Sequence, residues 1–293
     1  MLKRLPILCT ALLALAACSN SSDNGTAAPS AAPAPTASAT ATPSPASAGS
    51  SAPAAPQSAA APASTGSTAA TPAPTPAAAP VAAAPFVDNG KWVEGKDYEL
   101  IEPAQPKFTG TDKVEVLEVF SYGCPACNAY HATMNQLAKQ IPANAVVAYL
   151  PASFMPQENW VTLQRAYLTA KALGVADKAN DAMYDAVWKT KELTAENPSG
   201  SGLKPKDALP TIEDIAKVYA KFGADPKDFV ATANSFSINT QMKRSDELMK
   251  GYNVDGTPTL VIDGKYRVSP LKLGNDQSIE LVNWLVAKEA AGK

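Results

Sequence analysis

Residues 114–127, VEVLEVFSYGCPAC, decide the fold of this chain. The first seven are rich in β-branched and apolar side chains and predict a strand. The next three turn the chain, and the last four open a segment in which apolar side chains recur at helical spacing as far as Ile141. Residues 146–150 predict a second strand, so the order strand, helix, strand favours a right-handed crossover in a parallel sheet of an α/β protein.

The two cysteines of this segment are placed for redox chemistry. Cys124 falls at the helix N-terminus, where unpaired backbone N–H groups and the helix dipole stabilise a thiolate, the reactive form. Cys127 is within one turn, so it can close a disulfide with Cys124 or resolve a mixed disulfide. Pro125 suits the first helical turn because its missing N–H has no intrahelical partner there. A structural disulfide is less favoured, because so short a loop constrains the unfolded chain little.

A zinc site is the main competing interpretation of a Cys-x-x-Cys pair. Zinc needs about four protein or solvent ligands. His131 is the sole histidine, and no second Cys-x-x-Cys motif occurs. We therefore expect no metal and no other cofactor beyond the cysteine pair itself.

Residues 1–17 have the pattern of an export signal. Lys3 and Arg4 precede an apolar stretch that is too short to span a bilayer comfortably, and the small residues LAA then lead into Cys18. This arrangement resembles a bacterial lipoprotein signal and implies cleavage before Cys18 and lipidation of its sulfur. The alternative is an ordinary secretory signal, with Cys18 there by chance.

Residues 18–87 are dominated by Ala, Pro, Ser and Thr and show no bulky apolar periodicity. Ordering them would bury too little apolar surface to offset the lost entropy, so they predict a disordered tether that holds a domain off a membrane. The folded part, residues 88–293, is long enough for one domain with an insertion. The net charge is only −2 and no basic block occurs, which argues against a nucleic-acid partner.

At two distant places the sequence resembles the DsbA family. Residues 117–127, LEVFSYGCPAC, are similar to its active-site region, and residues 256–265, GTPTLVIDGK, resemble its cis-proline strand and turn. The resemblance covers roughly residues 88–293 and implies a thioredoxin fold with an inserted helical domain at about residues 156–250. Composition and periodicity in this insertion predict four helices, at residues 159–174, 178–188, 211–222 and 239–250.

The resemblance also implies roles for the site residues in a dithiol oxidase. Cys124 attacks or is attacked first, and Cys127 is the resolving or leaving sulfur. A cis bond before Pro258 would turn the backbone of Thr257 toward the cysteines, where it can pair with an extended client chain. The implied partners are reduced exported client proteins and a DsbB-like, quinone-linked membrane protein that re-oxidises the pair.

Glu118 matches the family's buried glutamate below the disulfide, and a buried carboxyl there can exchange the proton of Cys127. The alternative is a charge on an exposed face or at a strand end, and that interpretation suits Glu115. The family's lysine partner is missing, with Tyr149 aligned in its place.

The residues between the cysteines, Pro125 and Ala126, are expected to tune the redox potential. Ala126 stands where the best-known family members have histidine, which removes one stabiliser of the thiolate. His131 lies one turn beyond Cys127 and would partly replace that charge. A solvated surface histidine is the simpler interpretation.

The sequence thus predicts a periplasmic enzyme, anchored to a cell-envelope membrane by N-terminal lipid, that introduces disulfide bonds into exported proteins. A disulfide isomerase or reductase would use the same residues with a different redox potential. Isomerases of this fold usually add a dimerisation domain, which the low-complexity tether does not supply. A surface lipoprotein that uses the fold only for binding is a further alternative, disfavoured by the intact cysteine pair.

Overall fold

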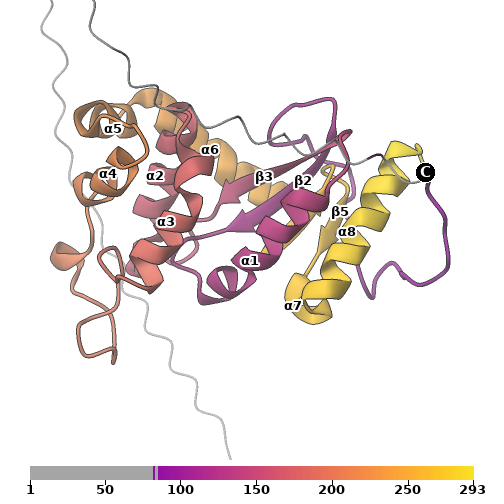
Figure 1. Ribbon diagram of the computed structural model, residues 1–293, viewed down its shortest axis with the longest axis horizontal. Helices are drawn as coiled ribbons and strands as arrows, with labels where there is room; N and C mark the ends of the chain where they lie inside the picture. Colours follow the sequence, from indigo (N-terminus) through magenta and orange to yellow (C-terminus); the bar gives the residue numbers. More distant parts are fainter. Residues whose placement is uncertain (1–81, 83–84) are drawn as a thin grey trace, which may run out of the picture. The chain divides into compact units, whose positions relative to one another are not determined.

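The computed structural model describes residue 82 and residues 85–293, and these contain the folded unit (Figure 1). The predicted signal peptide, Cys18 and nearly all of the predicted tether lie outside the described residues. Within the described part, none of the helices combines the length and the apolar character needed to cross a bilayer.

Five strands form one mixed sheet in the order β1-β5-β4-β2-β3. The interior strand β2 (Val114–Phe120) runs parallel to β3 (Ala145–Pro151) and antiparallel to β4 (Thr259–Ile262). Two shorter antiparallel strands, β5 (Tyr266–Val268) and β1 (Glu99–Leu100), complete the sheet. Because β2 is paired on both sides and buried along almost its whole length, its sequence reads as a nearly continuous apolar run.

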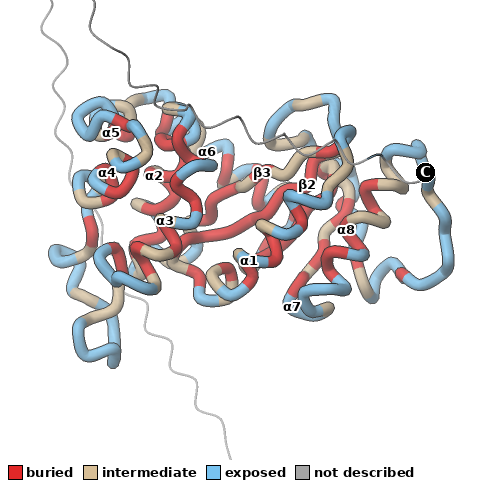
Figure 2. The backbone as a smooth tube through the Cα atoms, viewed as in Figure 1, coloured by how far each residue is buried: buried red, intermediate tan, exposed pale blue. Residues whose placement is uncertain are grey.

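One face of the sheet is covered by α1 (Pro125–Gln140) and α8 (Asn275–Ala290), the latter preceded by the short helix α7 (Pro270–Leu273). The apolar stripe of α1 is buried against the sheet, as its spacing predicts. Figure 2 shows the buried residues concentrated on the central strands and the inner faces of these helices. The core on this side includes Val116, Tyr130, Met134, Leu137, Leu260, Ile262, Leu281, Val282 and Leu285.

The other face shares a core with a helical insertion between β3 and β4. Leu117, Val119 and Val261 contribute to this core from the sheet. The insertion consists of η1 (Pro156–Glu158), α2 (Trp160–Ala172), α3 (Ala176–Trp188), η2 (Lys206–Ala208), α4 (Ile212–Ala220), α5 (Pro226–Ala233) and α6 (Phe236–Gly251).

The short helix α5 has no counterpart among the helices predicted from the sequence. Its start is nevertheless encoded locally, because Asp225 accepts hydrogen bonds from the backbone N–H groups of Lys227 and Asp228, and Pro226 occupies the first helical position. The Asp-Pro pair was therefore an available signal for a helix N-terminus.

The sequence predicts Glu115 on an exposed face or at a strand end. It is the second residue of β2, but the prediction of an exposed face is wrong. Its side chain is fully buried and accepts hydrogen bonds from the backbone N–H groups of Phe108 and Thr109, at 2.9 and 2.7 Å. The hydroxyl of Thr109 also donates to it. The carboxylate thus holds the loop before β2 against the strand, and these bonds offset the cost of burying its charge.

The segment before β1 packs on the last helix. The ring of Phe86 lies 5.4 Å from that of Trp284 in α8, and Tyr98 lies 5.9 Å from the same indole. Lys91 forms an ion pair with Glu280 of the same helix at 2.5 Å. The start of the described fold is therefore fixed to α8.

Candidate active site

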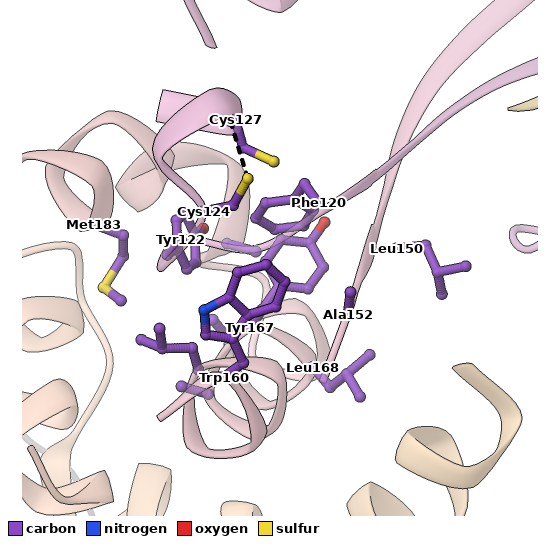
Figure 3. Packing of buried hydrophobic residues seen from close by; sticks show 14 of the residues in the cluster. Phe120, Tyr122, Cys124, Cys127, Leu150, Ala152, Trp160, Tyr167, Leu168 and Met183 are labelled. Atoms are coloured by element: carbon purple, nitrogen blue, oxygen red, sulfur yellow. Dashed lines mark hydrogen bonds between the residues drawn. The ribbon is translucent and has the colours of Figure 1, made fainter. Parts of the chain in front are cut away.

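The cysteine pair lies where β2 ends and α1 begins. Cys124 is the N-cap residue of α1 and Pro125 is its first residue. The backbone N–H of Cys127 donates to the sulfur of Cys124 at 3.2 Å, as Figure 3 shows. Both residues are thiols and both are buried, with Cys124 4% exposed and Cys127 fully enclosed.

The surroundings make the two thiols very different acids. Hydrogen bonding with the Cys127 side chain lowers the pKa of Cys124 to about 6. Backbone N–H groups at Ala126 and Cys127 also lower it, whereas burial of the thiol raises it. Burial raises the pKa of Cys127 far above its ordinary range, and its hydrogen bond to Cys124 and the nearby Glu118 carboxyl raise it further. Near neutral pH the site therefore holds one thiolate and one thiol.

The loop before β4 borders the sulfur of Cys124. The sulfur of Cys124 lies 3.5 Å from the carbonyl oxygen of Thr257, to which it donates a hydrogen bond when it is protonated. The peptide bond between Thr257 and Pro258 is cis, as the family resemblance implies. The hydroxyl of Thr259 donates to the carbonyl of Gly256 at 2.8 Å and closes the loop. The backbone at residue 257 is thus held beside the reactive sulfur.

Glu118 lies on β2 and is 1% exposed. Its Oε1 atom has no hydrogen-bond partner among the described residues. Burial, with a smaller contribution from Cys124, raises the pKa of this carboxyl well above its usual value. Its neighbour across the β2–β3 pair is Tyr149, whose own pKa is raised by burial and by Glu118. A carboxyl in such surroundings retains its proton to higher pH and can exchange it with a thiolate.

The helical insertion holds the turn before Cys124. The indole N–H of Trp188 donates to the carbonyl of Tyr122 at 2.8 Å, and the hydroxyl of Tyr122 donates to Asn180 at 2.8 Å. Trp160 lies so close to Gly123 that a Cβ atom there would be 2.6 Å from the indole nitrogen. Tyr122 and Trp160 lie next to the pair in Figure 3. These contacts could not be predicted from the sequence, because no local pattern joins residues so far apart in the chain.

His131 is not a solvated surface residue, so that prediction is wrong. Its side chain is only 12% exposed and contacts Asp181 of α3 at 2.6 Å. Its ring also packs on Tyr184, with 4.2 Å between centroids. Asn135 donates to the same carboxylate at 3.0 Å, so these contacts join α1 to the insertion.

The residues between the cysteines contribute no polar side chain. Pro125 is exposed and Ala126 is half-buried. In the part of the chain that the structure describes, no cluster of three or more His, Cys, Asp or Glu side chains is arranged to hold a metal ion. The groups next to the reactive sulfur are the second sulfur, the buried carboxyl of Glu118 and the backbone at Thr257.

Known proteins are similar to this chain in both sequence and fold. The chain matches the family described as thioredoxin over residues 110–278. It is 32% identical to the thiol:disulfide interchange protein DsbA of Pseudomonas aeruginosa over 202 residues, which are 68% of this chain and 87% of that protein. It is 31% identical over 178 residues to DsbA of Burkholderia cepacia, covering 61% of this chain and 76% of the relative.

Two solved structures extend the comparison. The crystal structure of Pseudomonas aeruginosa DsbA superposes with a TM-score of 0.58 at 31% identity, covering 70% of this chain and 97% of the other. The oxidoreductase DsbA from Xylella fastidiosa superposes with a TM-score of 0.59 at 27% identity, covering 68% and 98%. The predicted thioredoxin fold with an inserted helical domain is confirmed. The chain belongs to the DsbA family and is a thiol–disulfide oxidoreductase.

Proposed function

We propose that this chain is a dithiol oxidase that introduces disulfide bonds into exported proteins through Cys124 and Cys127. The observation that carries the proposal is the lowered pKa of Cys124 at the N-terminus of α1. A couple is oxidising when its reduced form is stabilised, and a stable thiolate stabilises the reduced form. The family relationship supports the same assignment.

The reaction begins with the Cys124–Cys127 disulfide. A client thiolate attacks the sulfur of Cys124, a mixed disulfide forms, and Cys127 leaves and takes up a proton because its pKa is so high. A second client thiolate then attacks the client sulfur of the mixed disulfide. Cys124 leaves as a thiolate, the client gains a disulfide, and the enzyme is left reduced by two electrons.

Two further residues serve these steps. Glu118 holds a proton next to Cys127 and supplies it when the sulfur leaves. The backbone of Thr257, before Pro258, lies beside Cys124 and pairs with the client chain as an added strand would. The client is thereby held with its sulfur next to Cys124.

A reductase or isomerase would use the same residues. Ala126 offers the thiolate no side-chain hydrogen bond, so the couple is expected to be less oxidising than in a relative with histidine there. Equilibration with glutathione measures the reduction potential. A reduction potential as low as that of thioredoxin would contradict the oxidase assignment and favour a reductase or isomerase.

We further propose that the protein acts in the periplasm, held to a membrane by lipid on Cys18, and that a DsbB-like quinone-linked oxidase restores its disulfide. The export pattern of residues 1–17 and the tether composition of residues 18–87 support this location. Replacing Cys18 with serine should move the protein from the membrane fraction to the soluble fraction. A wild-type protein that fractionates as freely soluble would contradict the anchor.

Trapping of intermediates tests the assigned order of attack. The variant Cys127→Ala should accumulate mixed disulfides between Cys124 and client proteins, because the resolving sulfur is missing. The variant Cys124→Ala should accumulate few or none, because Cys127 is enclosed and has a high pKa. Equal trapping by both variants would remove the assignment of Cys124 as the attacked sulfur.

A further inference from the structure

A cleft of about 190 Å³ opens beside the cysteine pair on the side of the helical insertion. Gly123 and Pro125 of the active-site turn border it directly. Its apolar lining includes Leu163, Val187, Trp188, Leu193 and Leu203. A client side chain next to the reacting cysteine is thus offered an apolar recess within reach of Cys124.

A second and larger hollow, of about 990 Å³, lies against α2. Its lining is largely apolar, and two of the apolar side chains are conspicuously open to solvent, Val161 at 39% and Leu203 at 42% exposed. The apolar lining residues are Pro156, Val161, Leu203, Leu209, Pro210 and Ile212. A hollow of this size accepts several residues of an extended chain rather than one side chain.

The two hollows are neighbours and share one wall residue. Leu203 borders both, and the turn η1 gives Pro156 to the larger hollow and Glu158 to the smaller one. Leu203 is held in place by a short hairpin, in which Lys204 N–H donates to the carbonyl of Ala195 at 2.8 Å. We name the two hollows together the insertion groove.

The charges of the larger hollow are unbalanced. Arg165, Lys204 and Lys206 line it together with one carboxylate, Glu213, whereas the smaller hollow is lined by two carboxylates, Glu158 and Glu196. None of the three cations forms an ion pair within the described residues. Arg165 donates to the carbonyl of Ala233 at 2.6 Å and Lys204 to a backbone carbonyl at 2.8 Å. These bonds fix the two side chains in the wall without neutralising them, so an acidic residue of a bound chain would meet unpaired positive charge.

We propose that the insertion groove binds the client polypeptide beyond its reacting cysteine. The preferred client segment is extended, with an apolar residue next to the cysteine and an acidic residue farther along. The inference rests on the proposed function, because the groove begins at Gly123 and Pro125. No residue of the loop at 256–259 lines it, so it extends the site in a direction that the Thr257 backbone does not serve.

The position of the groove favours a client over any other occupant. A client in mixed disulfide with Cys124 has its neighbouring residues beside the smaller hollow already, so their binding is intramolecular and is favoured by a high effective concentration. The apolar lining gives affinity, and the unpaired cations select the charge of the segment.

The test uses the oxidised full-length protein and reduced single-cysteine peptides. One series places leucine next to the cysteine and aspartate at increasing separations on either side, and matched series replace the leucine with serine or the aspartate with lysine. The peptides with both leucine and aspartate should have the highest kcat/KM of all the series. This advantage should appear only when the aspartate lies on one particular side of the cysteine. Leu203→Ser should lower that value by about fivefold, the effect expected from losing part of one buried leucine contact.

Two pairs of variants separate the groove from general effects. Lys206→Glu should remove the preference for aspartate over lysine, whereas Lys227→Glu, an exposed lysine of α5, should keep it. Val87→Ser changes an apolar residue that is 68% exposed elsewhere and is the control for Leu203→Ser. Oxidation of dithiothreitol, which is too small to reach the groove, should be equal in all four variants.

The outcomes distinguish the two proposals. A wild-type protein that oxidises neither dithiothreitol nor peptides overturns the proposed function. A protein that oxidises both, but shows no preference among the peptides, overturns only the groove. The same holds if Leu203→Ser slows dithiothreitol as much as peptides. Sedimentation that shows self-association abolished by Leu203→Ser would assign the groove to a second copy of the chain and overturn client binding.

Discussion

Relative to the wild type, replacing Glu118 with glutamine should favour the folded protein more at neutral pH than at acidic pH. The buried carboxyl has a pKa well above the value of 4.5 that it has in the unfolded chain. Below pH 4.5 both states hold the proton. As the pH rises from 4.5 toward the folded pKa, the unfolded chain releases its proton and the folded chain does not, so stability falls. Glutamine has the same shape and no proton to retain, so it removes this loss.

The size of the gain follows from the pH interval. For each pH unit over which the folded chain retains a proton that the unfolded chain has lost, the free energy of unfolding falls by about 1.4 kcal/mol. A carboxyl still protonated at pH 7 covers the whole interval from 4.5, which sets an upper bound of about 3.4 kcal/mol. The unpaired amide of glutamine costs about 1–3 kcal/mol at every pH. The quantity to compare is therefore the change in free energy of unfolding caused by Glu118→Gln at neutral pH and the same change at acidic pH.

Urea unfolding at about pH 4 and about pH 7 measures this difference. Glu115→Gln is the matched control, because it changes the same residue type on the same buried strand. The Glu115 carboxylate accepts hydrogen bonds from two backbone N–H groups and a hydroxyl, and an amide nitrogen in its place would face those donors. This variant should lose stability at pH 7.

If Glu118→Gln changes the free energy of unfolding by the same amount at about pH 4 and at about pH 7, the folded protein does not retain the Glu118 proton and the prediction is wrong. A second measurement uses the contribution of Cys124 to the raised pKa of Glu118. The thiolate is present only in the reduced protein, so the variant should stabilise the reduced form more than the oxidised form. Its reduction potential should therefore rise.

Three further predictions concern the turn at the start of α1. Thiolate absorbance of Cys124 should titrate with a midpoint at about pH 6, and Cys127→Ala should raise that midpoint because the largest stabilising hydrogen bond is lost. An unchanged midpoint would assign the low pKa to the helix N-terminus alone. Ala126→His should raise the reduction potential by tens of millivolts. One hydrogen bond to a charged group contributes about 1.5–3 kcal/mol, and about 30 mV corresponds to about 1.4 kcal/mol. Glutathione equilibration measures the potential, and a lower potential in the variant would contradict the prediction. Gly123→Ala should lower the free energy of unfolding by about 1–3 kcal/mol, because its Cβ would lie 2.6 Å from the Trp160 indole nitrogen; an unchanged urea midpoint would show that the indole moves freely.

The strand β2, the first helix and the cysteine geometry follow from local sequence. The β-branched run from Val114, the proline at the first helical position and the apolar spacing of α1 are all encoded within a short stretch of chain. The helical insertion was recognisable because its helices carry their own composition. The helix that was missed, Pro226–Ala233, is only 8 residues long, so it has room for few repeats of an apolar pattern.

The surroundings of the two glutamates of β2 could not be predicted from the sequence. Alternation places Glu115 and Glu118 on opposite faces of the sheet, but it does not say what covers each face. The partners of Glu115 come from a loop at residues 108–109, and Oε1 of Glu118 is buried without a hydrogen-bond partner among the described residues. Trp188 reaches the active-site turn from the end of α3 in the same unpredictable way. Long-range contacts of this kind depend on the completed fold.

The packing of Phe86 and Tyr98 on Trp284 determines where mechanical load would enter the molecule. A pull on the chain ahead of Phe86 is resisted first by these rings and by the ion pair of Lys91. It next reaches β1, an edge strand with only two residue pairs to β5. The strand that leads to the cysteines has seven pairs with β3 and lies three places from β1 in the sheet. Tension would therefore peel the edge of the sheet while the catalytic turn keeps its geometry.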